Sequence, residues 1–239
     1  METGQKPFKL KHFEIQQDEQ VMKVGTDGLL LGAWVDVNHK ENALDIGTGT
    51  GLIPLMMAQR NTKLNIVGID IHDASAALAK LNFETSKFSQ QLSSVAKSLQ
   101  AYDPQRQFDL IVTNPPFFSG GTLSDNSDRN RMRQTTKLSH QDLLSNVKRL
   151  LSPDGSFALI LPPLEGLRFI EMASFFNLHC NRVTEIYPRS TQPVKRMLLN
   201  FSRQQPIVVE RDSFEIDKGG RNQWTDAYIA LTKDYHPEL

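Results

Sequence analysis

A short apolar run, a glycine-rich turn and a second apolar segment follow one another between residues 43 and 60. Ala43-Leu-Asp-Ile46 is typical of a buried strand, Gly47-Thr-Gly-Thr-Gly51 of a tight turn, and Leu52–Arg60 of a helix. Small residues between a strand and a helix let a ligand approach the backbone closely, and the first N–H groups of the helix face that ligand. The stretch therefore predicts the first βα unit of a nucleotide-type α/β fold.

Two acidic residues lie near this turn. Asp70 follows Gly51 by 19 residues, at the end of an expected strand over 65–69, where a carboxylate can accept hydrogen bonds from ribose hydroxyls. Asp45 precedes the glycines, where a carboxylate repels a pyrophosphate but attracts a ligand that carries an ammonium and a sulfonium group. S-adenosylmethionine is such a ligand, and the G-x-G-x-G spacing differs from the G-x-G-x-x-G pattern of dinucleotide sites. A βα turn without a ligand is the alternative.

A second strand, Phe108–Thr113, ends at two prolines. Pro115 and Pro116 cannot donate to a ladder, so the turn is rigid and lies where open α/β sheets bind ligands. The Asn114 side-chain oxygen and the Pro115 carbonyl can accept from both N–H groups of an exocyclic amine, and Phe117 offers a flat face for a base. The alternative is a plain turn that ends a strand.

Basic residues gather in two places, although Lys+Arg and Asp+Glu both number 27 and the net charge indicates no particular partner. The first cluster is near the start of the chain. The second lies in the glycine-, serine- and arginine-rich segment 119–136 and just after it, beside the proline turn, where contact with phosphate is favoured over a merely solvated loop. The residues expected to contact RNA are Lys9, Lys11, Arg129, Arg131, Arg133 and Lys137.

Composition limits the remaining possibilities. The 239 residues, 39% of them hydrophobic, suit one domain over 1–239, with an N-terminal segment over 1–34, a catalytic core over 38–203, and a C-terminal strand and helix over 204–239. Cys180 is the sole cysteine, which excludes an intrachain disulfide and fits the cytoplasm. No signal peptide or membrane span is expected, and the scattered histidines lack the spacing of metal ligands.

The remaining strands and helices alternate along the chain. Seven strands are expected to form a mostly parallel sheet with one antiparallel strand and helices on both faces. These strands span 43–46, 65–69, 92–99, 108–113, 156–161, 180–187 and 196–201, with a possible edge strand over 207–216. A turn over 153–155 precedes the fifth of them. A helix over 28–34 is expected to be capped by Thr26 or Asp27, and a helix over 138–151 to open at Ser139.

This order of strands, with the glycine turn first and Asn114-Pro-Pro-Phe117 after the fourth, resembles the class I S-adenosylmethionine-dependent methyltransferases over essentially the whole chain. Enzymes of this class that methylate adenine N6, guanine N2 or glutamine N5 share close variants of the proline turn. The block Met22–Trp34 is similar to the signature of the bacterial tRNA1(Val) (adenine-N6)-methyltransferases, as are the arginines of 129–133 and the segment Met197–Arg203. One departure is the end of the third strand, Lys97–Gln100, which lacks the acid that often meets the cofactor adenine.

The resemblance implies methylation of adenine N6 in tRNA, at the adenosine 3′ of the anticodon, by an enzyme expected to be monomeric. The expected catalytic residues are Asn114, Pro115, Pro116 and Phe117. The expected cofactor-binding residues are Lys23, Thr26, Asp27, Asp45, Gly47, Gly49, Gly51, Asp70, Ile71, Ser98, Leu99 and Asn114. A guanine-N2 rRNA methyltransferase, a protein glutamine-N5 methyltransferase and a non-catalytic RNA-binding module are the alternatives.

Overall fold

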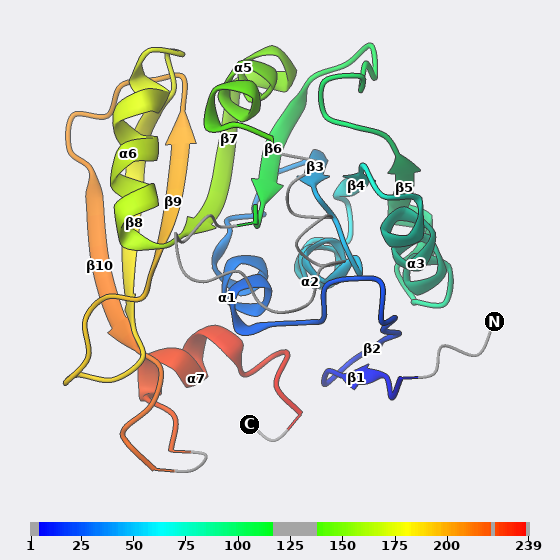
Figure 1. Ribbon diagram of the computed structural model, residues 1–239, viewed down its shortest axis with the longest axis horizontal. Coiled ribbons are helices and arrows are strands. Elements are labelled where there is room, and N and C mark those ends of the chain that lie inside the picture. Colours follow the sequence, from blue (N-terminus) through cyan, green and yellow to red (C-terminus); the bar gives the residue numbers. More distant parts are fainter. Residues whose placement is uncertain (1–4, 117–137, 221–222, 238–239) are drawn as a thin grey trace.

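A twisted, mostly parallel sheet crosses the protein (Figure 1). The computed structural model describes residues 5–116, 138–220 and 223–237. Within these residues the sheet has eight strands in the order β10-β8-β9-β7-β6-β3-β4-β5, and β9 alone runs antiparallel to its neighbours. The strands are β3 Asn42–Ile46, β4 Asn65–Asp70, β5 Leu92–Ala96, β6 Phe108–Thr113, β7 Leu151–Leu161, β8 His179–Tyr187, β9 Arg196–Ser202 and β10 Glu210–Glu215.

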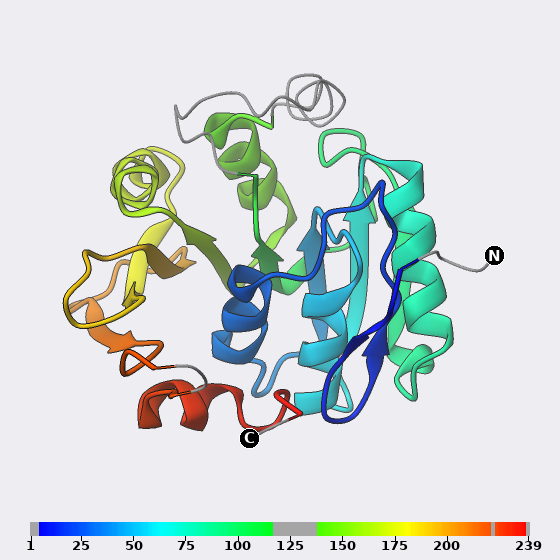
Figure 2. The ribbon, with the colours of Figure 1, turned by 60° about the horizontal axis from the view of Figure 1, so that its bottom comes forward.

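Helices cover both faces of the sheet (Figure 2). One face carries α1 Thr26–Trp34, α2 Leu52–Arg60, α3 Asp73–Glu84 and α7 Asp226–Thr232. The other face carries α5 His140–Leu150 and α6 Pro163–Ser174. A 3₁₀ turn, η1 Ser89–Gln91, precedes β5, and a hairpin of β1 Phe8–Lys9 and β2 Glu14–Ile15 lies beside the sheet. Among these helices none is long and apolar enough to cross a membrane.

Alternation along the strands explains the two apolar cores. Leu110 and Val112 of β6 face the core under α1 and α2, whereas Ile111 between them faces the core under α5 and α6. This period of two places apolar side chains on both faces of a strand, as expected where helices cover both sides of a parallel sheet. The central strands are therefore buried, and polar groups collect at their ends.

The structure confirms most of the expected elements and corrects four details. Strand β5 ends at Ala96, three residues before the expected end at residue 99. The sheet has eight strands rather than seven, because the segment expected as a possible edge strand pairs in parallel with β8. Residues 153–155, expected to form a turn before the strand, lie within β7, which already begins at Leu151. Its pairing with β6 has an irregular register there. Neither Thr26 nor Asp27 caps α1, whose N-cap is Gly25 without a side-chain hydrogen bond. Ser139 does cap α5, because its hydroxyl accepts from the Asp142 N–H at 3.0 Å.

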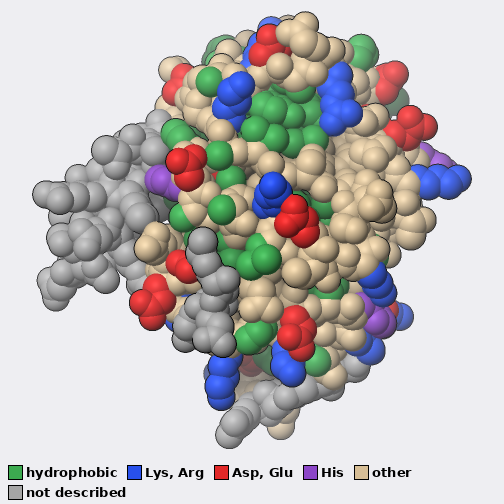
Figure 3. Space-filling view, turned by 90° about the vertical axis from the view of Figure 1, so that its right-hand side faces the viewer, with side chains coloured by type: hydrophobic (Ala, Val, Ile, Leu, Met, Phe, Trp, Pro, Cys, Tyr) green, Lys and Arg blue, Asp and Glu red, His purple; other side chains and the backbone are tan. Residues whose placement is uncertain are grey.

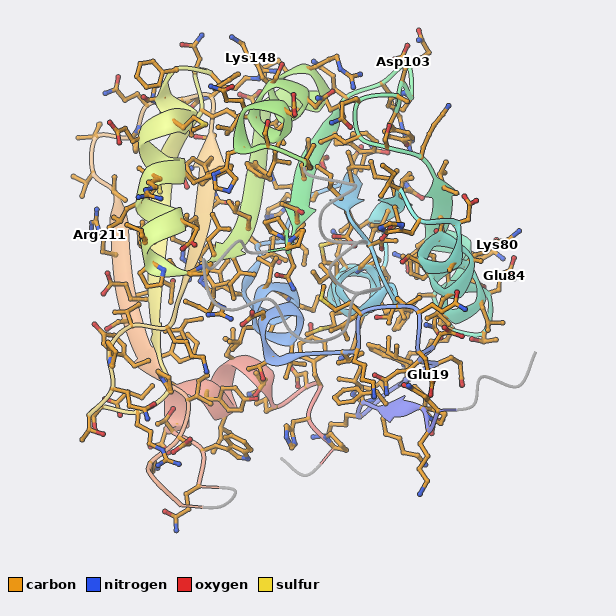
Figure 4. The ribbon with its side chains drawn as sticks, in the orientation of Figure 1. Glu19, Lys80, Glu84, Asp103, Lys148 and Arg211 are labelled. Atoms are coloured by element: carbon orange, nitrogen blue, oxygen red, sulfur yellow. The ribbon has the colours of Figure 1, made fainter. Side chains whose placement is uncertain are left out.

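Charges of both signs are interspersed on the side of the molecule that carries α3 and β5 (Figure 3). Lys80 and Glu84, one helical turn apart on α3, illustrate the pattern, with 3.8 Å between Nζ and Oε1 (Figure 4). Exposed pairs of this kind stabilise a fold only slightly. The described part of this side therefore offers no broad field of one sign for a polyanion.

Candidate cofactor and base site

The glycine turn between β3 and α2 has the left-handed backbone that only glycine adopts readily. Gly47, Gly49 and Gly51 have φ values of 71°, 54° and 81°. A Cβ on Gly51 would lie 2.4 Å from the Phe83 ring, so this glycine lets α3 pack against the turn. A Cβ on Gly47 would meet nothing within 4 Å, and one on Gly49 only the Gly47 carbonyl at 4.0 Å. The turn thus leaves open backbone where a ligand can approach.

Asp70, at the end of β4, accepts a hydrogen bond from this turn. Its Oδ2 accepts from the Gly49 N–H and its Oδ1 from the His72 N–H, both at 3.0 Å. The side chain is buried, with 8% of its surface exposed. Each carboxylate oxygen can accept more than one hydrogen bond, so these contacts orient Asp70 without using up its capacity. The carboxylate is held where two hydroxyls of a ribose could be bound.

Asp45 is the most unusual group of the site. Its residue is 1% exposed, and neither carboxylate oxygen has a hydrogen-bond partner among the described residues. Burial raises the pKa of Asp45 to about 7, while the adjacent Thr48 hydroxyl opposes the rise and the charge of Asp70 adds to it. A buried carboxylate without a partner is costly unless a cation approaches it. The buried Asp45 carboxylate therefore fits a ligand that carries a positive charge.

Asn114 follows β6, the neighbour of β3 in the sheet. The end of β6 is tied to the end of β3, because Thr113 Oγ1 donates to the Ile46 carbonyl at 2.8 Å. Asn114 and Pro115 are half-buried and Pro116 is exposed. On the α1 side, a Cβ on Gly28 would lie 4.0 Å from the Asn114 amide nitrogen, so a glycine there permits close approach. Two carbonyl-type acceptors thus sit one strand away from Asp45.

The segment after β5 offers fewer side chains to a ligand than the sequence predicted. Leu99 is 4% exposed and packs in the core under α5 and α6, so only its backbone can face a ligand. Ser98 is half-buried, and its hydroxyl accepts from the Ala101 N–H at 3.3 Å. Ile71, directly after Asp70, is 49% exposed and presents an apolar surface that could lie against a purine.

The other predicted site residues divide into three groups. Lys23 lies before α1 and Thr26 in its first turn, and both are exposed. Asp27 is paired with Arg196, with 2.9 Å between Oδ2 and Nε. Lys9 and Lys11 lie at the β1–β2 hairpin, where Lys9 faces Glu14 at 3.4 Å and Lys11 donates to the Lys233 carbonyl at 3.2 Å. Outside the described residues lie Phe117, Arg129, Arg131, Arg133 and Lys137. No group of three potential metal ligands occurs in the described residues.

Asn82 on α3 supports the glycine turn, a contact that the sequence did not reveal. Its buried amide accepts from the Gln16 N–H at 2.8 Å and donates to the carbonyls of Gln16 at 3.1 Å and Thr50 at 2.9 Å. It thereby joins the segment before α1 to the glycine turn. A single asparagine within a helix carries no motif, so only the tertiary contacts identify it.

The fold is that of the Rossmann-like methyltransferases. A family model described as methyltransferase small domain matches residues 20–184. A relative from Trichodesmium erythraeum, named tRNA1(Val) (adenine(37)-N6)-methyltransferase, is 39% identical over 237 residues that cover 98% of each chain. The chain belongs to the family of the tRNA1(Val) (adenine-N6)-methyltransferases.

Solved structures agree with the fold. A predicted O-methyltransferase from Agrobacterium tumefaciens superposes with a TM-score of 0.64 at 18% identity, over 87% of this chain and 96% of that one. A 16S rRNA N2 G1207 methyltransferase from T. Thermophilus, solved with AdoMet and guanosine, gives 0.58 at 19% identity, over 83% of this chain and 50% of that one. At such low identity the likeness concerns the fold alone.

Proposed function

We propose that the protein transfers a methyl group from S-adenosylmethionine to N6 of an adenine in tRNA, at the adenosine 3′ of the anticodon of tRNA1(Val). The observation that carries this proposal is the position of the partnerless Asp45 carboxylate next to Asn114. Asp45 pairs in register with Val112, two residues before Asn114, on strands about 4.8 Å apart. A site for a cation therefore adjoins acceptors for an amine. The names of the family members supply the position in tRNA.

The cofactor would lie across the carboxyl ends of β3 and β4. Bound S-adenosylmethionine supplies a methyl group on a positively charged sulfur. Asp45 would balance the positive charge of this ligand, and Asp70 would accept from the ribose hydroxyls. Gly47 and Gly49 give the ligand room, and Ile71 would cover the adenine. Lys23, Thr26, Gly51, Ser98 and the Leu99 backbone would border this cradle.

The target adenine would lie against the proline turn. Its N6 lone pair is conjugated with the ring, which makes the amine a weak nucleophile. Acceptance of both N–H groups by Asn114 Oδ1 and the Pro115 carbonyl favours a pyramidal nitrogen whose lone pair faces the methyl group. Positioning then accounts for most of the rate, and no base is needed before transfer. The proton leaves the product amine afterwards, while Phe117 is proposed to stack on the base and Pro116 to stiffen the turn.

The whole chain is proposed to act as one domain. The C-terminal region supports this, because β10 joins the sheet and Tyr235 donates to the Met56 carbonyl at 3.1 Å in the core under α1 and α2. We place the enzyme with its tRNA in the cytoplasm, as a monomer. The basic residues named above would contact tRNA phosphates.

A methyl-transfer assay with radiolabelled cofactor tests the proposal. Total tRNA, total rRNA and a protein extract, each from cells without this activity, are offered separately. We expect label in tRNA, recovered after digestion as N6-methyladenosine. Label in guanosine of rRNA would favour a guanine-N2 enzyme, label in protein a glutamine-N5 enzyme, and label nowhere a non-catalytic RNA-binding module.

A further inference from the structure

An ion pair joins two distant parts of the chain beside the proposed base site. Asp27, in the first turn of α1, accepts from Nε of Arg196, the first residue of β9, at 2.9 Å. Both side chains are largely shielded, with 24% and 21% of their surfaces exposed. Nη1 of Arg196 also donates to the Lys195 carbonyl at 2.8 Å, so the guanidinium has a defined orientation. None of these contacts involves the glycine turn.

The sheet register places Arg196 at the same edge as Asn114. Thr113 of β6 is opposite Leu159 of β7, and Leu159 is opposite Leu199 of β9. Arg196 lies three residues nearer the carboxyl edge along the antiparallel β9. Two strand spacings separate β6 from β9, a lateral distance of roughly 10 Å. The ion pair therefore borders the proline turn on the side away from the glycine turn.

The first turn of α1 spans the distance between Arg196 on β9 and Asn114 after β6. Gly28, directly after Asp27, comes so close to its neighbours that a Cβ would lie 3.1 Å from Leu52 Cδ2 and 4.0 Å from the Asn114 amide nitrogen. The helix start thus lies close to Asn114 at Gly28 and is anchored to β9 through Asp27. A shift of this turn would be transmitted to the Asn114 side chain, because packed interiors have little spare room.

We propose that Arg196 is a positioning residue, and that its pair with Asp27 holds the first turn of α1 against Asn114 so that the carboxamide keeps the orientation needed for the target amine. This inference rests on the proposed function. It assigns Asp27 to the base side of the site, and it replaces the expectation that Asp27 binds the cofactor.

The test compares single-turnover methylation of unmodified tRNA with the affinity for S-adenosylmethionine measured by calorimetry. Asp27→Asn and Arg196→Gln should each lower the single-turnover rate about tenfold, a barrier increase of about 1.4 kcal/mol. Cofactor affinity should change less than twofold. The charge-swapped double variant, Asp27→Arg with Arg196→Asp, should recover at least half of the lost barrier, because it restores an ion pair between the same two elements.

Arg189→Gln is the matched control. Arg189 forms an ion pair of similar length, 2.7 Å to Asp217, next to the end of β8. Its loss should leave the rate unchanged. Thermal melting of every variant reports folding, and Arg196→Lys, which keeps the charge but not the planar fork, replaces Arg196→Gln if the latter does not fold.

Four results would overturn the inference. An equal loss of rate and cofactor affinity in Asp27→Asn would make Asp27 a cofactor ligand. A double variant no better than the single ones would show that the pair itself does not act. An equal loss of rate in Arg189→Gln would indicate a general effect on stability. Wild-type protein that methylates no tRNA would instead refute the proposed function, whereas active wild type with fully active Asp27→Asn would refute only the role of the pair.

Discussion

Asp45→Asn should stabilise the protein without ligand and at the same time destroy its cofactor site. The pKa of Asp45 is about 7 in the fold, against an ordinary value of 3.8. Because the folded pKa is raised, the ionised carboxylate destabilises the fold, and this cost grows from about pH 4 until it is complete above pH 7. With 1.36 kcal/mol for each pKa unit, the cost at high pH is about 4 kcal/mol.

The dependence on pH makes this prediction specific. At pH 5 only about 1.5 kcal/mol of the cost is present, so the advantage of the asparagine variant should grow by up to about 3 kcal/mol between pH 5 and pH 8. For a domain of this size that corresponds to roughly 6–12 °C in melting temperature. Asp103→Asn, which removes a solvent-exposed carboxylate in the loop before β6 (Figure 4), is the control for the loss of one carboxylate.

Calorimetry with S-adenosylmethionine completes the experiment. Wild-type affinity should rise with pH up to about 7, by at most tenfold for each pH unit, because the ligand's positive charge selects the ionised carboxylate. Asp45→Asn should bind much more weakly, without this dependence. The reasoning is refuted if the stability difference between variant and wild type is the same at pH 5 and pH 8, or if the variant binds the cofactor as well as wild type.

Three further predictions concern the rest of the site. Asn114→Ala should lower the single-turnover rate more than tenfold, above about 1.4 kcal/mol, with cofactor affinity near wild type, and a smaller loss would leave the proline turn without a catalytic role. Asp70→Ala should weaken cofactor binding by about 1–3 kcal/mol in calorimetry, because it removes the proposed acceptor for the ribose and frees the Gly49 N–H; unchanged affinity would remove Asp70 from the site. Alanine in place of the three arginines of 129–133 should reduce the slope of log K for tRNA against log[salt] by roughly 0.7–0.9 for each lost phosphate contact, and an unchanged slope would mean that they bind no phosphate.

Local patterns were sufficient for much of the fold. Helix α2 and strand β6 have the bounds expected from the sequence, because the glycine turn and the two prolines fix where each can begin or end. Ser139 was recognisable as a cap because capping depends on neighbours only three residues away.

Local patterns do not predict contacts between residues that are far apart in the sequence. Asp27 fits the local rule for a cap, but its carboxylate pairs with Arg196, which is 169 residues away in the sequence. Leu99 was expected near the adenine because it lies at the end of the expected strand over 92–99, yet its side chain turns into the core. Asn82 was missed for the same reason: its partners belong to segments 32 and 66 residues away.

Strand β3 separates the proposed cofactor side of the sheet from the proposed base side, to which the antiparallel strand β9 belongs. The proposed cofactor contacts come from β3 and β4, whereas Asn114, Arg196 and the hairpin before β9 lie on the opposite side of β3. We therefore expect a change in the β8–β9 hairpin to alter the proposed base side of the site while the glycine turn stays as it is. Laboratory evolution aimed at a new acceptor should therefore keep the glycine turn and vary residues 190–195, between the control residue Arg189 and the positioning residue Arg196.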